Sequence, residues 1–597
     1  MRSRHIARLT TQVFAILFIA APVHAATPFA RAAGELDFVR RLRDATPPAA
    51  RPALTNLVEM VRMDDGVRLH TSVYLASQSG RYPAILVRTP YNDATDGLDD
   101  YGYSGIADYY CPRGYAVVIQ TIRGKYASEG TYRLMSRGEI DDGYAAIEWI
   151  SRQAWCDGNV AVMGVSHDGF DALAAGIRNP SGLKLVISGG GPADLRTDAF
   201  MQKGTLGTSL LDYIDFMFTE TGQPYDDLFF RLMETLGLPE PRLLAYDTLV
   251  SGKELPAWDE HIKAMSRVNS DYWQKRRIRD RLHECKLPIV QFAGLYSDGD
   301  MPDVLRNFEY LEERGIQGRL ILGWWAHGSS GPYGDVEGYT PPDVLKRYNA
   351  LLDYYLKGLS SPILNEKRIQ VFAAGEGKFV PSNTWPQLPG YTSREFYFAR
   401  GSTQAGKLLS APRSESKPNV SYAYDPKVLP TILYDPGPIR NHTDQLAFLS
   451  DPMPADTPVC GKASLTLYVS STARDTDFYA AAFVRQTDGT DRELGPGPGL
   501  LQARQRDGDY ARPKMLVPGQ VYAVTIEPPF ISGIVKKGER LGVVVFSNAF
   551  PVVIRNANSG KPIGSDKAFI TATQKFYLGK LYPSKLTLSC RSPSTGG

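Results

Sequence analysis

The spacing of apolar residues divides the chain at about residue 361. Between residues 84 and 324, short continuous apolar runs alternate with segments whose apolar residues recur at helical spacing. Continuous runs are typical of parallel strands buried on both faces, because the connecting helices cover such a sheet. We therefore expect an α/β domain with strands at 84–89, 115–121, 160–165, 183–188, 287–293 and 320–324.

A hairpin, helices and an insertion complete this domain. Two β-rich segments flank the turn signal Asp64-Asp65-Gly66 and predict a hairpin over 57–75. The stretch 195–285 is mostly helix-like and too long for a connection, so we expect it to form an inserted helical cap. Helical spacing predicts three further helices, at 139–151, between Gly169 and Asn179-Pro180, and at 342–357.

Beyond residue 361 the pattern is that of an all-β domain. Helical periodicity is almost absent, and Gly, Pro, Asn and Asp turns separate short alternating segments. We expect a jelly roll over 361–597, preceded by the α/β domain in two parts, 26–194 and 286–360, which flank the cap. The predicted strands lie at 369–373, 394–399, 465–470, 478–485, 521–526 and 542–546.

The first 25 residues have the pattern of a secretory signal peptide. Three arginines precede the apolar run 13–21, and small residues precede a cleavage site expected after Ala25. The run is shorter than the roughly 20 residues a membrane-spanning helix needs, and no later run reaches that length. We therefore expect a periplasmic or secreted protein that does not associate with a membrane once the signal is removed.

Composition and charge narrow the class of protein. The 597 residues are 43% hydrophobic and 22% charged, which is ordinary for a globular chain. The formal charge is only +3, and the three arginines of the signal account for it, so nucleic acid is not an expected partner. The five cysteines lack zinc-site spacing, and Cys460 and Cys590 are the pair we favour for a disulfide. The sequence does not determine the oligomeric state, and a homo-oligomer is possible.

The segment from Gly164 to Gly169 is the strongest chemical signal. It reads Gly-Val-Ser-His-Asp-Gly and lies between a predicted strand and a predicted helix. A strand-to-helix turn of this kind exposes a nucleophilic Ser166 and turns the following backbone N–H toward a developing oxyanion. Because glycine occupies the sixth place rather than the fifth, a Ser and Asp that merely begin a helix are the alternative interpretation.

A nucleophilic serine needs a histidine base and an orienting acid. In α/β proteins with such a turn, the acid and then the histidine follow the serine along the chain. Among the eight histidines, His327 directly follows a predicted strand in that order. Asp298 and Asp300 both follow the preceding strand and are candidates for the acid.

Several motifs together resemble a known family. The chain is similar to the cocaine-esterase and α-amino-acid ester hydrolase group, which is related to glutaryl acylases and X-prolyl dipeptidyl aminopeptidases. That family's turn reads G-x-S-Y-x-G, which accounts for the late Gly169. The other matching segments are Met60–Val67, Arg88-Thr89-Pro90-Tyr91, Arg123–Gly130, Trp155-Cys156-Asp157-Gly158, Asp475-Thr476-Asp477-Phe478 and Arg555-Asn556-Ala557-Asn558.

The resemblance implies a fold and a set of roles. It implies an α/β-hydrolase domain with a helical cap and a C-terminal jelly roll. It also implies that the protein hydrolyses small esters or amides without a metal or cofactor. The phenol of Tyr91 would stabilise the oxyanion together with the backbone N–H of His167, and the family's spacing favours Asp298 over Asp300 as the acid.

Within this family the motifs lean toward α-amino-acid esters, and Asp168 could pair with the substrate ammonium. An acid favoured by the helix dipole in the first turn is the plainer explanation of Asp168. An X-Pro exopeptidase, or a non-catalytic binding protein that uses the jelly roll, are the alternative functions.

Overall fold

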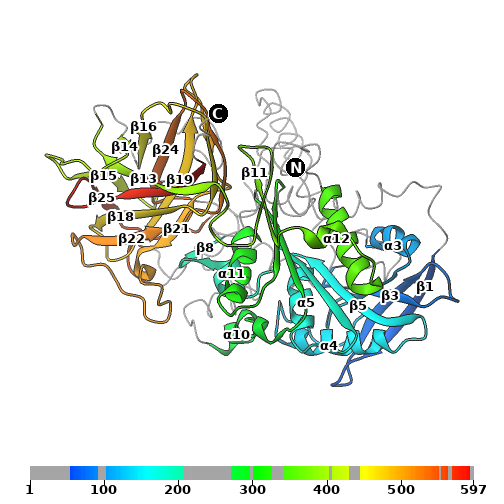
Figure 1. Ribbon diagram of the computed structural model, residues 1–597. Helices are drawn as coiled ribbons and strands as arrows, with labels where there is room; N and C mark the ends of the chain where they lie inside the picture. The colour runs from blue at the N-terminus through cyan, green and yellow to red at the C-terminus, as the bar shows by residue number, and fades with distance from the viewer. Residues whose placement is uncertain are drawn as a thin grey trace, which may run out of the picture.

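A computed structural model describes ten stretches of the chain, and two large β-sheets dominate them (Figure 1). One sheet has ten strands and is flanked by helices, and the other has fourteen strands. The described residues are 54–91, 103–207, 217, 270–295, 300–325, 341–401, 406–428, 444–549, 553–561 and 568–591.

The first sheet is parallel through its centre, as its apolar runs predict. Strands from β4 to β11 run parallel, and the predicted hairpin adds β1 and β2 antiparallel at one edge. Every residue of β4 is buried, as a strand covered on both faces requires. In sheet order the strands are β1 (Thr55–Arg62), β2 (Arg68–Leu75), β4 (Ala116–Thr121), β3 (Tyr82–Thr89), β5 (Cys156–Val165), β6 (Leu183–Gly189), β9 (Ile289–Gly294), β10 (Arg319–Gly323), β11 (Ile369–Ala373) and β12 (Lys378–Ser382).

The helices that pack against this sheet include two closely associated pairs, α4 with α5 and α3 with α12, and also α11. Helices α4 and α5 approach closely because Gly143 lacks a side chain: a Cβ there would lie 2.6 Å from the Cβ of Ala175. Asn349 of α12 donates a hydrogen bond of 2.6 Å to the hydroxyl of Tyr109 in α3. The helices are α3 (Ser104–Tyr110), α4 (Gly138–Ser151), α5 (His167–Gly176), α10 (Asp271–Gln274), α11 (Asp300–Glu312) and α12 (Pro341–Lys357).

Strands β11 and β12 differ from the expectation. The alternation placed 369–373 in the C-terminal domain, but β11 pairs in parallel with β10 and extends the first sheet. Its other end contacts the second sheet, since the Ser532 hydroxyl donates to the carbonyl of Phe372 and accepts from the N–H of Ala374, both at 2.8 Å. The alternation shows that a segment is a strand, but which sheet it joins depends on tertiary packing.

The second sheet forms the predicted all-β region. Except for the parallel pair β14 and β16, its strands pair antiparallel, and their inward side chains form one apolar cluster. The jelly-roll connectivity stays a prediction. The strands are β13 (Tyr391–Ala399), β14 (Gly406–Leu409), β15 (Asn419–Tyr424), β16 (Gln445–Ser450), β17 (Thr457–Gly461), β18 (Ser464–Ser471), β19 (Asp477–Arg485), β20 (Asp491–Glu493), β21 (Gly499–Gln502), β22 (Tyr522–Ile526), β23 (Ile531–Val535), β24 (Arg540–Phe546), β25 (Ala572–Tyr577) and β26 (Lys585–Arg591).

The predicted disulfide between Cys460 and Cys590 is wrong. Both thiols are buried and free, although β17 and β26 are neighbours. Val459, not Cys460, lies opposite Cys590, and Cys590 packs in the core of the second sheet. Cys460 packs in a different cluster, together with residues of β10 and β11. Because side chains alternate along a strand, the one-residue offset puts the two thiols on opposite faces.

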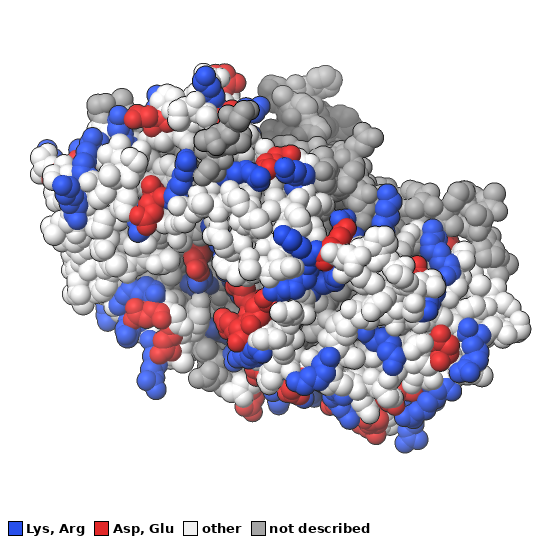
Figure 2. All heavy atoms as spheres, in the orientation of Figure 1, with Lys and Arg blue, Asp and Glu red and all other residues white. Residues whose placement is uncertain are grey.

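The expected cap lies mostly outside the described residues. Its described parts are the π-helix η3 (Arg196–Phe200), the hairpin of β7 (Met201–Gln202) and β8 (Thr205–Leu206), α10 and the 3-10 helix η4 (Arg279–Glu284). The expected signal peptide also lies outside them. In the described part of the chain, no helix combines the length and apolarity needed to cross a membrane. Basic and acidic side chains are interspersed over the face seen in Figure 2.

Candidate active site

Ser166 lies at the turn between β5 and α5, in a backbone conformation that a serine rarely adopts. Its φ is 62° and its ψ is −123°. Such a conformation is strained for a residue with a side chain, and strain of this kind concentrates at functional sites. The turn is held by the Ser166 N–H, which donates to the carbonyl of Gly189 at 2.7 Å, and by the Phe170 N–H, which donates to the Ser166 carbonyl at 3.1 Å.

Two glycines make this turn possible. A Cβ on Gly164 would collide with the backbone of Asp168, and a Cβ on Gly169 would lie 2.6 Å from the carbonyl oxygen of Gly189. Helix α5 therefore begins directly against the ends of β5 and β6. The close approach at the sixth place of the motif, rather than the fifth, explains why glycine stands at 169.

The imidazole of His167 is suited to packing rather than to proton transfer. The side chain is fully buried, and its ring lies 6.4 Å from the rings of both Tyr132 and Phe170. Burial, and then the positive charges of Lys125 and Arg88, lower the pKa of His167 to about 3. The ring is therefore neutral at physiological pH, and the backbone N–H is the part of His167 that could serve chemistry at Ser166.

A chain of hydrogen bonds connects Tyr91 to the start of α5. The Tyr91 N–H donates to the Thr89 hydroxyl at 3.1 Å, and that hydroxyl lies 2.7 Å from the hydroxyl of Tyr103. The Tyr103 hydroxyl donates to the Oδ2 of Asp168 at 2.6 Å. Because Tyr103 donates to the carboxylate, the Thr89 hydroxyl must donate to Tyr103. All four residues are buried, so the chain joins the end of β3 to the residue two places after Ser166.

Asp168 is thus bound within the protein. Its side chain is only 4% exposed and accepts the short bond from Tyr103. This environment differs from the one expected for a carboxylate that binds a substrate ammonium. It favours a positioning role for Asp168.

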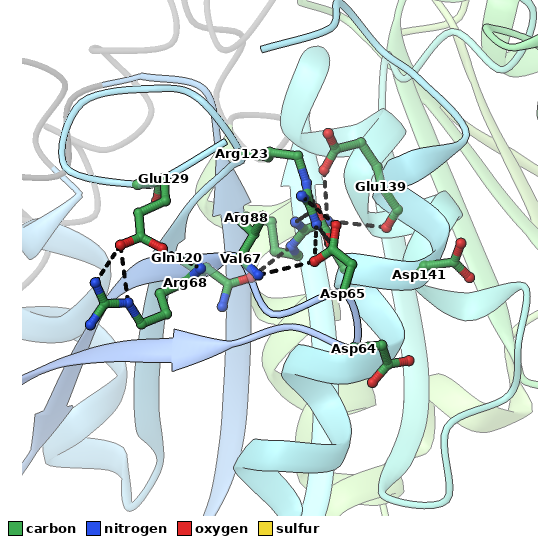
Figure 3. Close-up of polar contacts among 12 residues, drawn as sticks. Asp64, Asp65, Val67, Arg68, Arg88, Gln120, Arg123, Glu129, Glu139 and Asp141 are labelled. Atoms are coloured by element: carbon green, nitrogen blue, oxygen red, sulfur yellow. Dashed lines mark hydrogen bonds and ion pairs between the residues drawn. The ribbon is translucent and has the colours of Figure 1, made fainter. Parts of the chain in front are cut away.

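Arg88 near the end of β3 belongs to a cluster of charged side chains (Figure 3). Arg88 donates to the side chain of Gln120 at 2.9 Å and forms an ion pair of 3.0 Å with Glu139. Nearby, Arg123 bridges Asp142 and the hairpin residue Asp65. Burial raises the pKa of Glu139 to about 7, despite the opposing effect of Arg88.

The loops that carry the predicted acid and base begin side by side. Strands β9 and β10 pair in parallel with Gly294 opposite Gly323, and the Leu295 N–H donates to the Gly323 carbonyl at 2.8 Å. Asp298 and His327 lie outside the described residues. Asp300 is the first residue of α11, and its side chain is not described.

The sequence analysis did not predict the hydrogen bonds of Tyr103 or the burial of Lys125. Tyr103 belongs to no recognised motif, so its role becomes visible only through its bonds to Thr89 and Asp168. Lys125 is buried, and its ammonium donates to the carbonyl of Met217 in the expected cap at 3.0 Å. Burial lowers the pKa of Lys125 to about 8. The unusual lysine of the motif at 123–130 was the only available signal.

The two motifs of the C-terminal domain meet in one buried network. The side-chain amide of Asn556 donates to Asp475 at 3.1 Å and to Asp477 at 2.7 Å. Arg504 forms an ion pair of 2.6 Å with Asp475. The segments 475–478 and 555–558 therefore stabilise one end of the C-terminal domain. This end contacts β8, because the N–H of Ile554, directly before the second motif, donates to the carbonyl of Leu206 at 2.8 Å.

Comparison with known proteins assigns both parts of the chain. Residues 65–329 match the X-Pro dipeptidyl-peptidase (S15 family), and residues 364–587 match the X-Pro dipeptidyl-peptidase C-terminal non-catalytic domain. The cocaine esterase of Rhodococcus sp. (strain MB1 Bresler) is 28% identical over 570 residues, which cover 89% of this chain and 97% of the esterase.

Two solved structures share the fold. An aminopeptidase from the marine sediment archaeon Thaumarchaeota archaeon has a TM-score of 0.77 at 22% identity, over 92% of this chain and 98% of its own. An α-amino acid ester hydrolase has a TM-score of 0.76 at 21% identity, over 91% and 97%. The α/β-hydrolase fold with a C-terminal β domain is thereby confirmed. The consecutive domain matches and the esterase relative show that the chain belongs to the X-Pro dipeptidyl-peptidase (S15) family of serine hydrolases, in its cocaine-esterase-like group.

Proposed function

We propose that the protein hydrolyses esters or amides of small acyl groups through an acyl-enzyme formed on Ser166. His327 accepts the hydroxyl proton as Ser166 attacks the carbonyl, and it returns that proton to the leaving group. Asp298 holds the imidazole in the required tautomer. The phenol of Tyr91 and the N–H of His167 stabilise the oxyanion, and water then releases the acid.

The backbone of Ser166 is the observation that carries this proposal. Nothing in the packing of an ordinary helix start calls for a serine at φ 62°, since asparagine or glycine adopts positive φ at lower cost. In a turn of this kind the serine side chain is exposed at the end of the strand and the next N–H lies at the start of the helix, as attack on a carbonyl requires.

The ends of β9 and β10 support the choice of acid and base. The two loops start from paired glycines, so residues a few places beyond them begin at neighbouring points of the same sheet edge as Ser166. Asp300 is the first residue of α11, and Asp298 comes two places earlier in the sequence. The spacing implied by the family resemblance favours Asp298 as the acid.

Two classes of substrate are candidates for this reaction. The motifs and the α-amino acid ester hydrolase fold relative favour α-amino-acid esters. The S15 match favours an X-Pro exopeptidase as the alternative. The Tyr103 hydroxyl binds one oxygen of the buried Asp168 carboxylate, so simple esters without an amino group are substrates to include.

The test combines active-site labelling with a substrate panel. A fluorophosphonate probe should label wild type and not Ser166→Ala. Ser188→Ala is the matched control, because the Ser188 hydroxyl on the neighbouring β6 donates to the Gly169 carbonyl at 2.9 Å. Turnover of amino-acid, simple and X-Pro p-nitrophenyl or p-nitroanilide substrates then separates the two candidates. Full labelling and turnover by Ser166→Ala would refute Ser166 as the nucleophile, and a wild type that neither reacts with the probe nor turns over any substrate would favour a binding protein.

The site of action is a further part of this proposal. We infer that residues 1–25 are removed during export and that the protein acts in the periplasm or outside the cell. N-terminal sequencing of the native protein should begin at Ala26. A native chain that retains Met1 in the cytoplasmic fraction would contradict export.

A further inference from the structure

Arg196 is a buried arginine that makes no hydrogen bond with its side chain within the described part of the chain. Its side chain is 2% exposed, and among the residues that the structure describes neither its Nε nor its Nη1 has an acceptor. Its recorded contact is with the Tyr510 ring of the C-terminal domain, whose centroid lies 5.4 Å from the guanidinium carbon. Arginine is almost never fully buried without a partner, because its charge loses the solvation of water.

The neighbouring carboxylates are already bound by other arginines. Arg277 forms an ion pair of 2.9 Å with Asp194. Arg279 and Arg306 both contact the buried carboxylate of Asp198, which also accepts backbone N–H bonds from residues 193 and 194. Arg306 also lies 3.7 Å from Asp303. The three neighbouring arginines thus form ion pairs with the three aspartates. Among the described residues Arg196 forms no ion pair, although the negative charge of Asp194 is close enough to act on its guanidinium.

The backbone that carries Arg196 is firmly held at the active edge of the sheet. Arg196 begins the π-helix η3 just after β6, whose last residue, Gly189, binds the N–H of Ser166. Asn307 of α11 donates to the carbonyl of Gly191 at 2.9 Å, and Asp198 fastens the next turn. Because the backbone here is already held, less conformational entropy is lost when a ligand binds Arg196.

We propose that Arg196 forms a binding site for a carboxylate, at the junction of the hydrolase domain and the C-terminal domain. A single carboxylate would pair with this guanidinium and accept two parallel N–H bonds from its planar fork. The carboxylate could belong to an ester substrate or to a free organic acid. The first source rests on the proposed function, and the second does not.

The first experiment needs no catalysis. Thermal unfolding of the full chain is measured in sodium acetate and in sodium chloride at equal ionic strength. A bound ligand raises the unfolding temperature in a saturable way, so wild type should show an acetate-specific rise that Arg196→Met lacks and Arg196→Lys reduces. Arg178→Met is the control, because Arg178 also lies over a tyrosine ring but has Asp141 as its partner at 3.0 Å.

The second experiment identifies the source. The ratio of kcat/KM for mono-p-nitrophenyl succinate to that for p-nitrophenyl butyrate is compared between wild type and Arg196→Met. A fall of about 10- to 100-fold, as for a lost charge-assisted pair, assigns the site to the substrate, and an unchanged ratio assigns it to a free acid. Wild type with no acetate-specific rise, or a rise that persists in Arg196→Met, overturns the proposal whether or not the enzyme turns over either ester.

Discussion

Replacing Tyr103 by phenylalanine tests whether the buried hydrogen-bond chain positions Tyr91. The change removes one hydroxyl that both donates to Asp168 at 2.6 Å and accepts from Thr89 at 2.7 Å, while it keeps the ring. A hydrogen bond to a charged group contributes about 1.5–3 kcal/mol and a neutral one about 1 kcal/mol. The free energy of unfolding should therefore fall by about 2–4 kcal/mol.

Activity should fall as well, and mainly in kcat. The Thr89 hydroxyl accepts a bond from the Tyr91 N–H, and in Tyr103→Phe it loses the acceptor that orients it. The Tyr91 phenol should then no longer be fixed relative to Ser166. A misplacement of about 1 Å at a reacting centre can cost on the order of 10²-fold, so we expect kcat to fall by about 10- to 100-fold with KM nearly unchanged. The assay is steady-state hydrolysis of a p-nitrophenyl ester, with urea unfolding measured on the same samples.

Tyr109→Phe is the matched control. Tyr109 lies on α3, which begins directly after Tyr103, and it is equally buried. Tyr109→Phe removes the hydroxyl that accepts a hydrogen bond of 2.6 Å from Asn349, which is unconnected with Tyr91. It should lose stability without losing kcat. Thr89→Ser should keep the chain and its activity, whereas Thr89→Val should behave like Tyr103→Phe. If Tyr103→Phe and Tyr109→Phe lower kcat equally, the chain is only structural and the reasoning fails.

Three further predictions concern the oxyanion, the acid and pH. Tyr91→Phe should lower kcat by about 10²–10³-fold with little change in unfolding temperature, and an unchanged kcat would place the oxyanion donor elsewhere. Asp298→Asn should cost on the order of 10⁴ in kcat and Asp300→Asn much less, while the reverse order would identify Asp300 as the acid. Because folding raises the pKa of Glu139 from 4.5 to about 7, the folded state binds more protons between these values, and stability should fall as pH rises through this window. Urea unfolding at several pH values should show a flatter profile for Glu139→Gln, and an identical profile would contradict this account.

Local patterns determined the elements of this protein. A continuous apolar run is sufficient for a buried strand and helical spacing for an amphipathic helix, so β3, β5, α4 and α5 form where the sequence predicts them. The turn at Ser166 could also be predicted, because the residues that permit it, Gly164 and Gly169, lie within the same six positions.

Only the tertiary structure decided which elements meet. The alternation of 369–373 is the same whether β11 joins the first sheet or the second, and the spacing of Cys460 and Cys590 does not show that they face opposite sides. Asp168 could be predicted as an acid in the first turn of a helix, but its bond to Tyr103, 65 residues earlier, could not. The sequence gives no sign that Arg196 lacks an ion pair, because folding decides which carboxylates lie near it and which other arginines bind them. A sequence pattern encodes the periodicity of its own segment, whereas charge, burial and hydrogen bonding at the site depend on segments that are distant in the chain.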